Sequence, residues 1–245
     1  MIYKNIKYKL YYLFEFIFKA FSLNEFKRFS NDNHGGLVLT FDNINLPDKE
    51  WVEYKLLKTD NSVKSISPND LPSDFCPKAR RLVDEFHKKT VNENVEWMLY
   101  FDYTTGEVIY CWKGNEDYTG GSYDKISFHG RNMASIHNHS KNYYSFPSPD
   151  NFDILENEFE DYEIITSVNT FWSVEFKGFV EKEVRQNFQY NIAKYMNRIN
   201  NKIISKYVDN DSINYLLEFY IGDYLLNFID KKINNIDLIL IKKEV

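Results

Sequence analysis

The chain has 245 residues, enough for one domain with additions or for two small domains. Hydrophobic residues make up 43% and charged residues 27%, the balance of a soluble globular protein rather than a disordered one. The formal net charge is −6, so no overall basic field attracts nucleic acid, and nucleic acid is not an expected partner. With 19 Tyr and 20 Phe, many aromatic rings must lie in the core.

The number of cysteines and the hydropathy of the sequence limit the kind of metal site and the compartment that we expect. Cys76 and Cys111 are the two cysteines, too few for a Cys-only zinc site or a disulfide framework. No stretch of about 18 uncharged apolar residues is present. These features predict a cytoplasmic protein in which any metal site is built from His and carboxylate side chains.

The N-terminal segment, residues 1–30, predicts a helix. Its apolar residues follow helical spacing, at Leu10, Leu13, Phe14, Ile17, Phe18 and Phe21. A helix of this kind packs on its own domain, or it contacts a membrane surface or a partner through residues 1–21. The second alternative is kept because the segment starts with several Lys residues.

Further along the chain, turn clusters separate apolar runs. Residues 31–36 predict a turn, and residues 36–41 and Trp51–Leu57 are interpreted as short strands. The Pro-rich loop 58–77 is the best domain boundary. The predicted domains are an N-terminal helix with a small strand region, a central core, and C-terminal helices with a final strand, at residues 1–76, 77–179 and 180–245.

The central and C-terminal parts alternate between strand and helix patterns. A helix is expected from Pro77 to about Thr90, and another from Ser148, with Pro149 at its first position, to about Phe159. Two helices broken near Asp209 are expected over 180–232. The expected strands are Glu96–Asp102, Glu107–Trp112, Met133–His137, Tyr162–Ser167, Phe171–Phe176 and Ile236–Ile241. Strand pairs with helices between them indicate a mixed α+β fold.

The segment with a chemical signature is His137-Asn138-His139. Residues two apart on a strand point the same way, so both imidazoles can face one ion. Two His ligands and one carboxylate leave an open position on zinc, where bound water becomes a nucleophile at neutral pH. A carboxylate that does not bind the metal can carry the proton.

The motif and its surroundings resemble the JAMM motif of the JAB/MPN metalloproteases, most closely the RadC-like branch. The matching text is HNHS at His137–Ser140 and PSPDN at Pro147–Asn151, where the family shows an upstream Glu, H-x-H, a loop, and S-x-x-D opening a helix. The resemblance covers roughly residues 90–178. It implies an MPN/JAB-like (cytidine-deaminase-like) mixed β-sheet flanked by helices, a Zn²⁺ cofactor, and a protein or peptide substrate.

The resemblance also implies roles for individual residues. His137 and His139 match the metal ligands, and Ser148 matches the serine that helps to hold the tetrahedral intermediate. Glu96 matches the upstream Glu that acts as general base. Two further glutamates stay open for this role, Glu93 and Glu107.

The third metal ligand is where this sequence departs from the family. That position falls on Asn151, with Asp150 and Asp153 on either side, and an Asn carbonyl is a neutral and poorer ligand than a carboxylate. The loop from His139 to Ser148 is one residue longer than the common spacing, so a shifted register would bring Asp150 to the metal. Asp150, Asn151 and Asp153 therefore all stay open as the third ligand.

Two functions follow from the sequence. The first is a zinc-dependent hydrolase of peptide or isopeptide bonds, with His137 and His139 on the metal. The alternative is a catalytically degenerate JAB/MPN-like scaffold or partner-binding protein, which Asn151 favours.

Overall fold

The computed structural model describes residues 29–31, 37–39, 48–115, 132–140, 144–155, 160–176, 181–232 and 238–245. Contacts divide the chain into two compact units, Met1–Pro47 and Asp48–Val245. In the first unit, β1 (Phe29–Asn31) pairs antiparallel with β2 (Leu37–Leu39), which lies within the strand expected over 36–41. Of the helix expected over residues 1–30, residues 1–28 lie outside the described residues, and its end is wrong, because Phe29 and Ser30 belong to strand β1. The membrane or partner contact expected for residues 1–21 also lies outside the described residues.

The second unit contains the sheet and the helices around it. Its helices are α2 (Lys49–Leu56), η1 (Pro68–Asp70), α3 (Pro77–Thr90), η2 (Pro149–Leu155), α5 (Lys182–Ile204), α6 (Asn210–Leu217), η3 (Glu218–Gly222) and α7 (Asp223–Lys232). Its strands are β3 (Trp97–Asp102), β4 (Glu107–Lys113), β5 (Met133–Asn138), β6 (Glu160–Thr166), β7 (Thr170–Phe176) and β8 (Leu238–Glu244). The elements η1 and η2 are 3-10 helices, and η3 is a π-helix.

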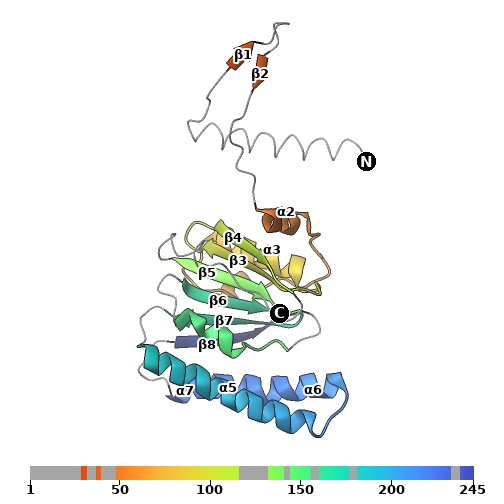
Figure 1. Cartoon of the computed structure of the whole chain (residues 1–245), viewed down its shortest axis with the longest axis vertical. Helices are drawn as coiled ribbons and strands as arrows, with labels where there is room; N and C mark the ends of the chain where they lie inside the picture. The colour runs from red at the N-terminus through yellow and green to blue at the C-terminus, as the bar shows by residue number, and fades with distance from the viewer. Residues whose placement is uncertain are drawn as a thin grey trace. The chain divides into compact units, whose positions relative to one another are not determined.

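The six strands form one open sheet in the order β4-β3-β5-β6-β7-β8 (Figure 1). All neighbours are antiparallel except β5 and β6, which are parallel. Both predicted hairpins are confirmed, β3–β4 across the Gly106 turn and β6–β7 across Asn169. The α+β class expected from the sequence is therefore confirmed.

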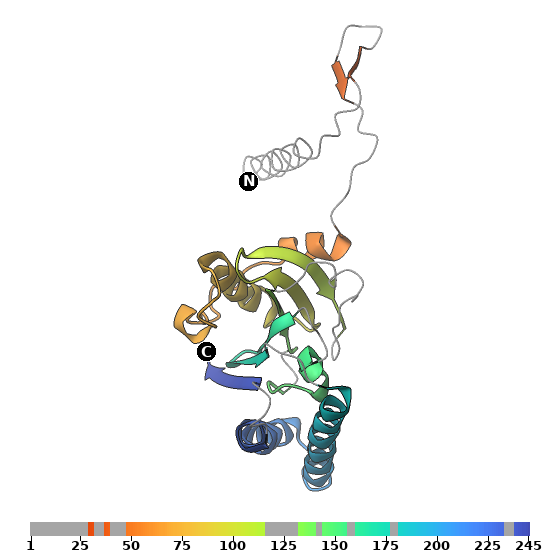
Figure 2. The same cartoon turned by 90° about the vertical axis from the view of Figure 1, so that its left-hand side faces the viewer.

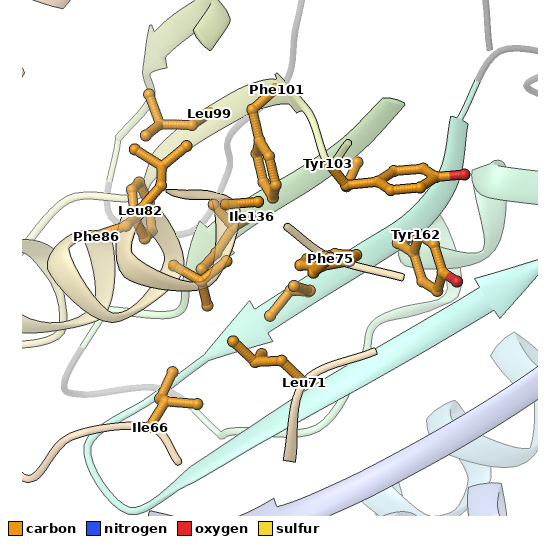
Figure 3. Close-up of a cluster of buried hydrophobic side chains, with 14 of the residues drawn as sticks. Ile66, Leu71, Phe75, Leu82, Phe86, Leu99, Phe101, Tyr103, Ile136 and Tyr162 are labelled. Atoms are coloured by element: carbon orange, nitrogen blue, oxygen red, sulfur yellow. The ribbon is translucent and has the colours of Figure 1, made fainter. Parts of the chain in front are cut away.

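One face of the sheet packs against α3, and we call it the α3 face. Alternating residues of β3, β5 and β6 point to this side and meet apolar residues of α3 and of the loop before it (Figure 3). Phe75 stacks on Tyr103 with ring centroids 5.5 Å apart and meets Tyr162 edge-on at 5.1 Å. This core includes Phe75, Leu82, Phe86, Trp97, Leu99, Phe101, Ile136, Tyr162 and Ile164.

The opposite face is called the histidine face, because His137 lies on it. Towards β7 and β8 it is covered by η2 and by the C-terminal helices, which stand on the other side of the molecule from α3 (Figure 2). This second core includes Phe152, Ile165, Trp172, Val174, Ile192, Leu217, Ile221 and Leu225. A small cluster of Met98, Tyr100, Tyr110 and Met133 lies at the β3–β4 end.

The segment Trp51–Leu57, interpreted as a strand, is instead part of helix α2. Trp51 and Tyr54 are three residues apart, so a helix places them on one side, where their rings stack 5.5 Å apart. Tyr54 is fully buried against Phe86 and Trp97 of the α3 core. Contact with this core, rather than strand pairing, decides the local structure.

The loop that predicted a domain boundary near residue 77 is part of the second unit. Arg80 on α3 donates hydrogen bonds to the carbonyls of Pro72 at 2.6 Å, Ser73 at 3.1 Å and Phe75 at 2.8 Å. Ile66, Leu71 and Phe75 of the loop are buried in the α3 core. The chain divides after Pro47, whereas the sequence predicted a boundary near residue 76.

Other predicted elements agree with the structure in position. The helix at Pro77–Thr90 and the break between two C-terminal helices near Asp209 are confirmed. The segment that opens at Pro149 is a 3-10 helix ending at Leu155, and residues 156–159 lie outside the described part. Within the described ranges, the helices are too short or too polar to cross a membrane.

Candidate functional site

The site is built on β5, the central strand that carries His137 and leads directly into His139. Every residue of β5 is buried, because β3 and β6 flank the strand in the middle of the sheet. His137 pairs with Met98 of β3 and with Ile165 of β6. His139 follows the end of the strand, where its N–H donates to the carbonyl of Thr166 at 2.9 Å. The two imidazole ring centroids lie 5.2 Å apart, as the H-x-H pattern predicts.

His137 lies against two polar side chains. Its Nε2 is 3.3 Å from the amide nitrogen of Asn151, and its Nδ1 is 3.5 Å from Oε1 of Glu163. The amide nitrogen can only donate, so Nε2 is the accepting nitrogen and the ring proton resides on Nδ1, facing the carboxylate. Burial, together with the neighbouring His139, holds the pKa of His137 well below its usual value, so this ring is neutral.

His139 is held through its other ring nitrogen. Its Nδ1 donates to the carbonyl of Tyr144 at 2.7 Å, and the Tyr144 ring meets the imidazole edge-on, with centroids 6.0 Å apart. Burial lowers the pKa of His139 to about 4, although the Tyr144 carbonyl opposes the shift. The Nε2 lone pair of His139 is therefore free of a proton, the arrangement that metal-ligating histidines show.

Asn151 reaches the imidazole from η2. Its Oδ1 accepts the Ser148 N–H at 2.6 Å, which is the contact that the third helical residue makes with the cap residue in a capping box. This bond sets the orientation of the amide, because an N–H must meet oxygen. The Nδ2 group therefore faces inward and donates to Oε1 of Glu163 at 3.0 Å as well as to His137.

Glu163 is the site residue that the sequence reasoning missed. It lies on β6 beside Ser135 of β5 and is 6% exposed. Its neighbours at 162, 164, 165 and 166 are all buried, so a charged residue stands in an otherwise buried strand. That signal is visible in the text YEIIT, and a carboxylate in such a run needs a polar partner.

Glu96 lies at the same end of the sheet as the histidines. It is buried and directly precedes β3, where Met98 pairs with His137, and its backbone is hydrogen-bonded to Gly114 and Asn115 after β4. Asn138 fixes this end of β3, since its Oδ1 accepts the Trp97 N–H at 2.7 Å and its Nδ2 donates to the Val95 carbonyl at 3.1 Å. The role of Glu96 as general base stays a prediction.

The remaining predicted residues have different outcomes. Ser148 lies at the start of η2 and contacts Asn151 through its backbone. The side chains of Asp150 and Asp153 lie outside the described part, so the alternatives that use them stay predictions. Glu93 and Glu107 do not belong to the contacts described for this cluster, and Glu107 is exposed.

The donors of the cluster can be tested against a zinc ion. His137 and His139 each have an unprotonated ring nitrogen, Nε2, of the kind that binds zinc, although that of His137 accepts from the Asn151 amide. Asn151 does not fit as the third, because its oxygen is bound to Ser148 and its NH₂ group faces the imidazole. Among the described side chains, no three of the His, Cys, Asp and Glu type come together as a metal-holding group.

The chain matches no protein-family model, no curated protein and no solved structure. The resemblance to the JAB/MPN family stays a prediction from the motif.

Proposed function

We propose that this chain is a JAB/MPN-like domain whose metal site has become a metal-free, hydrogen-bonded cluster, and that it acts as a scaffold or partner-binding module rather than as a peptidase. The order of parts supports the family assignment: a Glu before β3, a His pair at the end of β5, and a Ser-led helix that returns to His137. The observation that carries the loss of the metal is the inward-facing amide nitrogen of Asn151.

The Asn151 amide is hydrogen-bonded on both sides without a metal. The Asn151 NH₂ group offers two hydrogens, and the cluster supplies two acceptors, Oε1 of Glu163 and Nε2 of His137. Buried polar groups are costly unless they are paired, and this amide has its partners without a cation beside it. An Asp at position 151 would instead place a carboxylate oxygen about 3 Å from Glu163, where two negative charges repel.

The decisive experiment restores the missing carboxylate. In Asn151→Asp, one oxygen keeps the Ser148 N–H and the other takes the place of Nδ2 beside His137. We expect purified wild-type protein to contain no stoichiometric zinc and Asn151→Asp to contain about one zinc per chain. The measurement is metal content after dialysis against zinc and gel filtration. Thermal melts with chelator and with zinc should show that zinc stabilises only the variant.

Three further variants make this result specific. His137→Ala on the Asn151→Asp background should abolish zinc binding, and Asn201→Asp, an exposed change of the same chemistry, should not create it. Glu163→Gln on the Asn151→Asp background should raise the stability of the metal-free protein, because it removes the carboxylate pair. Absence of zinc from Asn151→Asp would contradict the JAB/MPN-type site.

A zinc-dependent hydrolase of peptide or isopeptide bonds is the second candidate. It is favoured by the orientation of the His139 imidazole, which holds its Nδ1 against the Tyr144 carbonyl and leaves the Nε2 lone pair available to a metal. One zinc per wild-type chain would support this candidate and overturn the degenerate one. Asp150→Asn would then test the shifted register by loss of the metal, and Glu96→Gln should keep the metal and abolish turnover.

A further inference from the structure

We propose that Glu218, on the π-helix η3, is a positioning residue for His139 and acts through a single peptide group. The inference rests on the proposed function in one respect, because it takes Nε2 of His139 as the ring nitrogen that acts in the site. It assigns to the C-terminal helices a part in the site that the motif does not include.

The connection consists of two hydrogen bonds to one peptide unit. The Tyr144 carbonyl accepts the proton on His139 Nδ1 at 2.7 Å. The N–H of the same peptide group, that of Ser145, donates to Oε1 of Glu218. The Ser145 hydroxyl donates to the other carboxylate oxygen at 2.9 Å, so the carboxylate is held at both oxygens.

The effect of these two linked hydrogen bonds follows from peptide resonance. A negative charge bound to the N–H polarises the peptide and makes its carbonyl oxygen a stronger acceptor. A stronger acceptor at Nδ1 keeps the proton there and leaves the Nε2 lone pair directed into the site. The arrangement resembles a carboxylate–histidine pair in which a peptide group stands between the two partners.

Packing on both sides keeps the carboxylate in place. Leu217 and Ile221, on either side of Glu218, are buried in the core of the histidine face. On the loop, the Tyr144 ring stacks on Phe146 at 4.2 Å, and Phe146 is 1% exposed in the same core. A π-helical turn changes the direction of side chains along a helix, and such turns are frequent at functional sites.

The test measures the imidazole directly. Nitrogen-15 NMR of the metal-free protein reports which ring nitrogen of His139 carries the proton. We expect a single Nδ1–H tautomer in the wild type and a mixture of tautomers in Glu218→Ala. Glu218→Gln should retain mostly the Nδ1–H form, because its amide oxygen can still accept. Melting curves and far-UV circular dichroism establish that each variant is folded.

Matched variants separate this role from a general effect on folding. Ser145→Ala removes only the hydroxyl bond and should leave the tautomer unchanged, as should Asp211→Asn, an exposed acidic residue on α6. On the Asn151→Asp background, Glu218→Ala should weaken zinc binding roughly 10-fold to 100-fold. An unchanged His139 spectrum in folded Glu218→Ala overturns the proposal; if the alanine variant does not fold, an unchanged spectrum in folded Glu218→Leu, which likewise cannot accept the Ser145 N–H, overturns it. The spectrum does not depend on whether position 151 can support a metal.

Discussion

At the scale of single residues, the identity of residue 151 decides the chemistry of the cluster. The sequence predicted that His137 and His139 share one face, and alternation along a strand is a local property that a sequence displays. Glu163 and Glu218 were not predicted, because their roles depend on strand pairing and on a helix 73 residues beyond Ser145. The orientation of the Asn151 amide also follows from a backbone contact that only the fold provides.

A second residue-scale property is the acid sensitivity expected from His87. This residue is fully buried on α3, and burial lowers its pKa to about 4 from the usual 6.5. Between these values the unfolded chain binds a proton that the folded chain excludes, so the free energy of unfolding falls as pH drops from 6.5 to 4. The contribution of this one group is about 3 kcal/mol.

Urea unfolding of the wild type and of His87→Gln at several pH values checks this expectation. His139 has a similarly lowered pKa, so both proteins should lose stability in acid, but the variant should lose less. Lys78→Gln, an exposed change on the same helix, should behave as the wild type does. Parallel pH profiles for His87→Gln and the wild type would show that His87 is not kept neutral by the fold.

At the scale of elements, the sequence predicted the parts whose signal is local. The β3–β4 and β6–β7 hairpins and helix α3 have alternation, turn residues and an N-terminal Pro, and all were predicted. Helix α2 was misassigned because a short run with Trp51 and Tyr54 fits either period, and the contact with Phe86 and Trp97 decides between them.

The turn between β3 and β4 gives a prediction at this scale. Gly106 has φ +67°, and a Cβ there would lie 2.7 Å from Lys78 Cγ and 2.8 Å from the backbone nitrogen of Ala79. Gly106→Ala is therefore expected to lower the free energy of unfolding by roughly 2–4 kcal/mol. Gly222→Ala is the matched control, because its Cβ would make only ordinary contacts, the closest at 3.6 Å to Trp172. It should be neutral or stabilising by up to about 1 kcal/mol in chemical denaturation.

At the scale of the whole molecule, the two cores of the second unit share one sheet. The loop before α3 contributes buried residues to the core on one face of this sheet, and the C-terminal helices contribute buried residues to the core on the other face. Residues 48–245 therefore form a single compact unit. The order of strand pairs and helices along the sequence predicted an α+β protein, but the extent of the unit depends on long-range contacts such as those of Arg80, which local patterns do not show.

A fragment of residues 48–245 is therefore expected to fold without the first 47 residues. Its thermal midpoint should lie within a few degrees of that of the full chain, since neither core described here includes a residue from the first unit. Differential scanning calorimetry of both proteins checks this. A loss of cooperative unfolding in the fragment would show that the first unit is required for the fold.

The last strand, β8, pairs with β7, the strand that precedes the C-terminal helices along the chain. Phe176 at the end of β7 and Leu238 at the start of β8 are direct partners in the ladder. Residues 177–237, which include the C-terminal helices, thus connect two adjacent antiparallel strands, as the loop of a simple hairpin does. A change in the length or content of this connection leaves the strand order of the sheet unchanged. Related proteins with the same strand order can therefore differ greatly in length between β7 and β8.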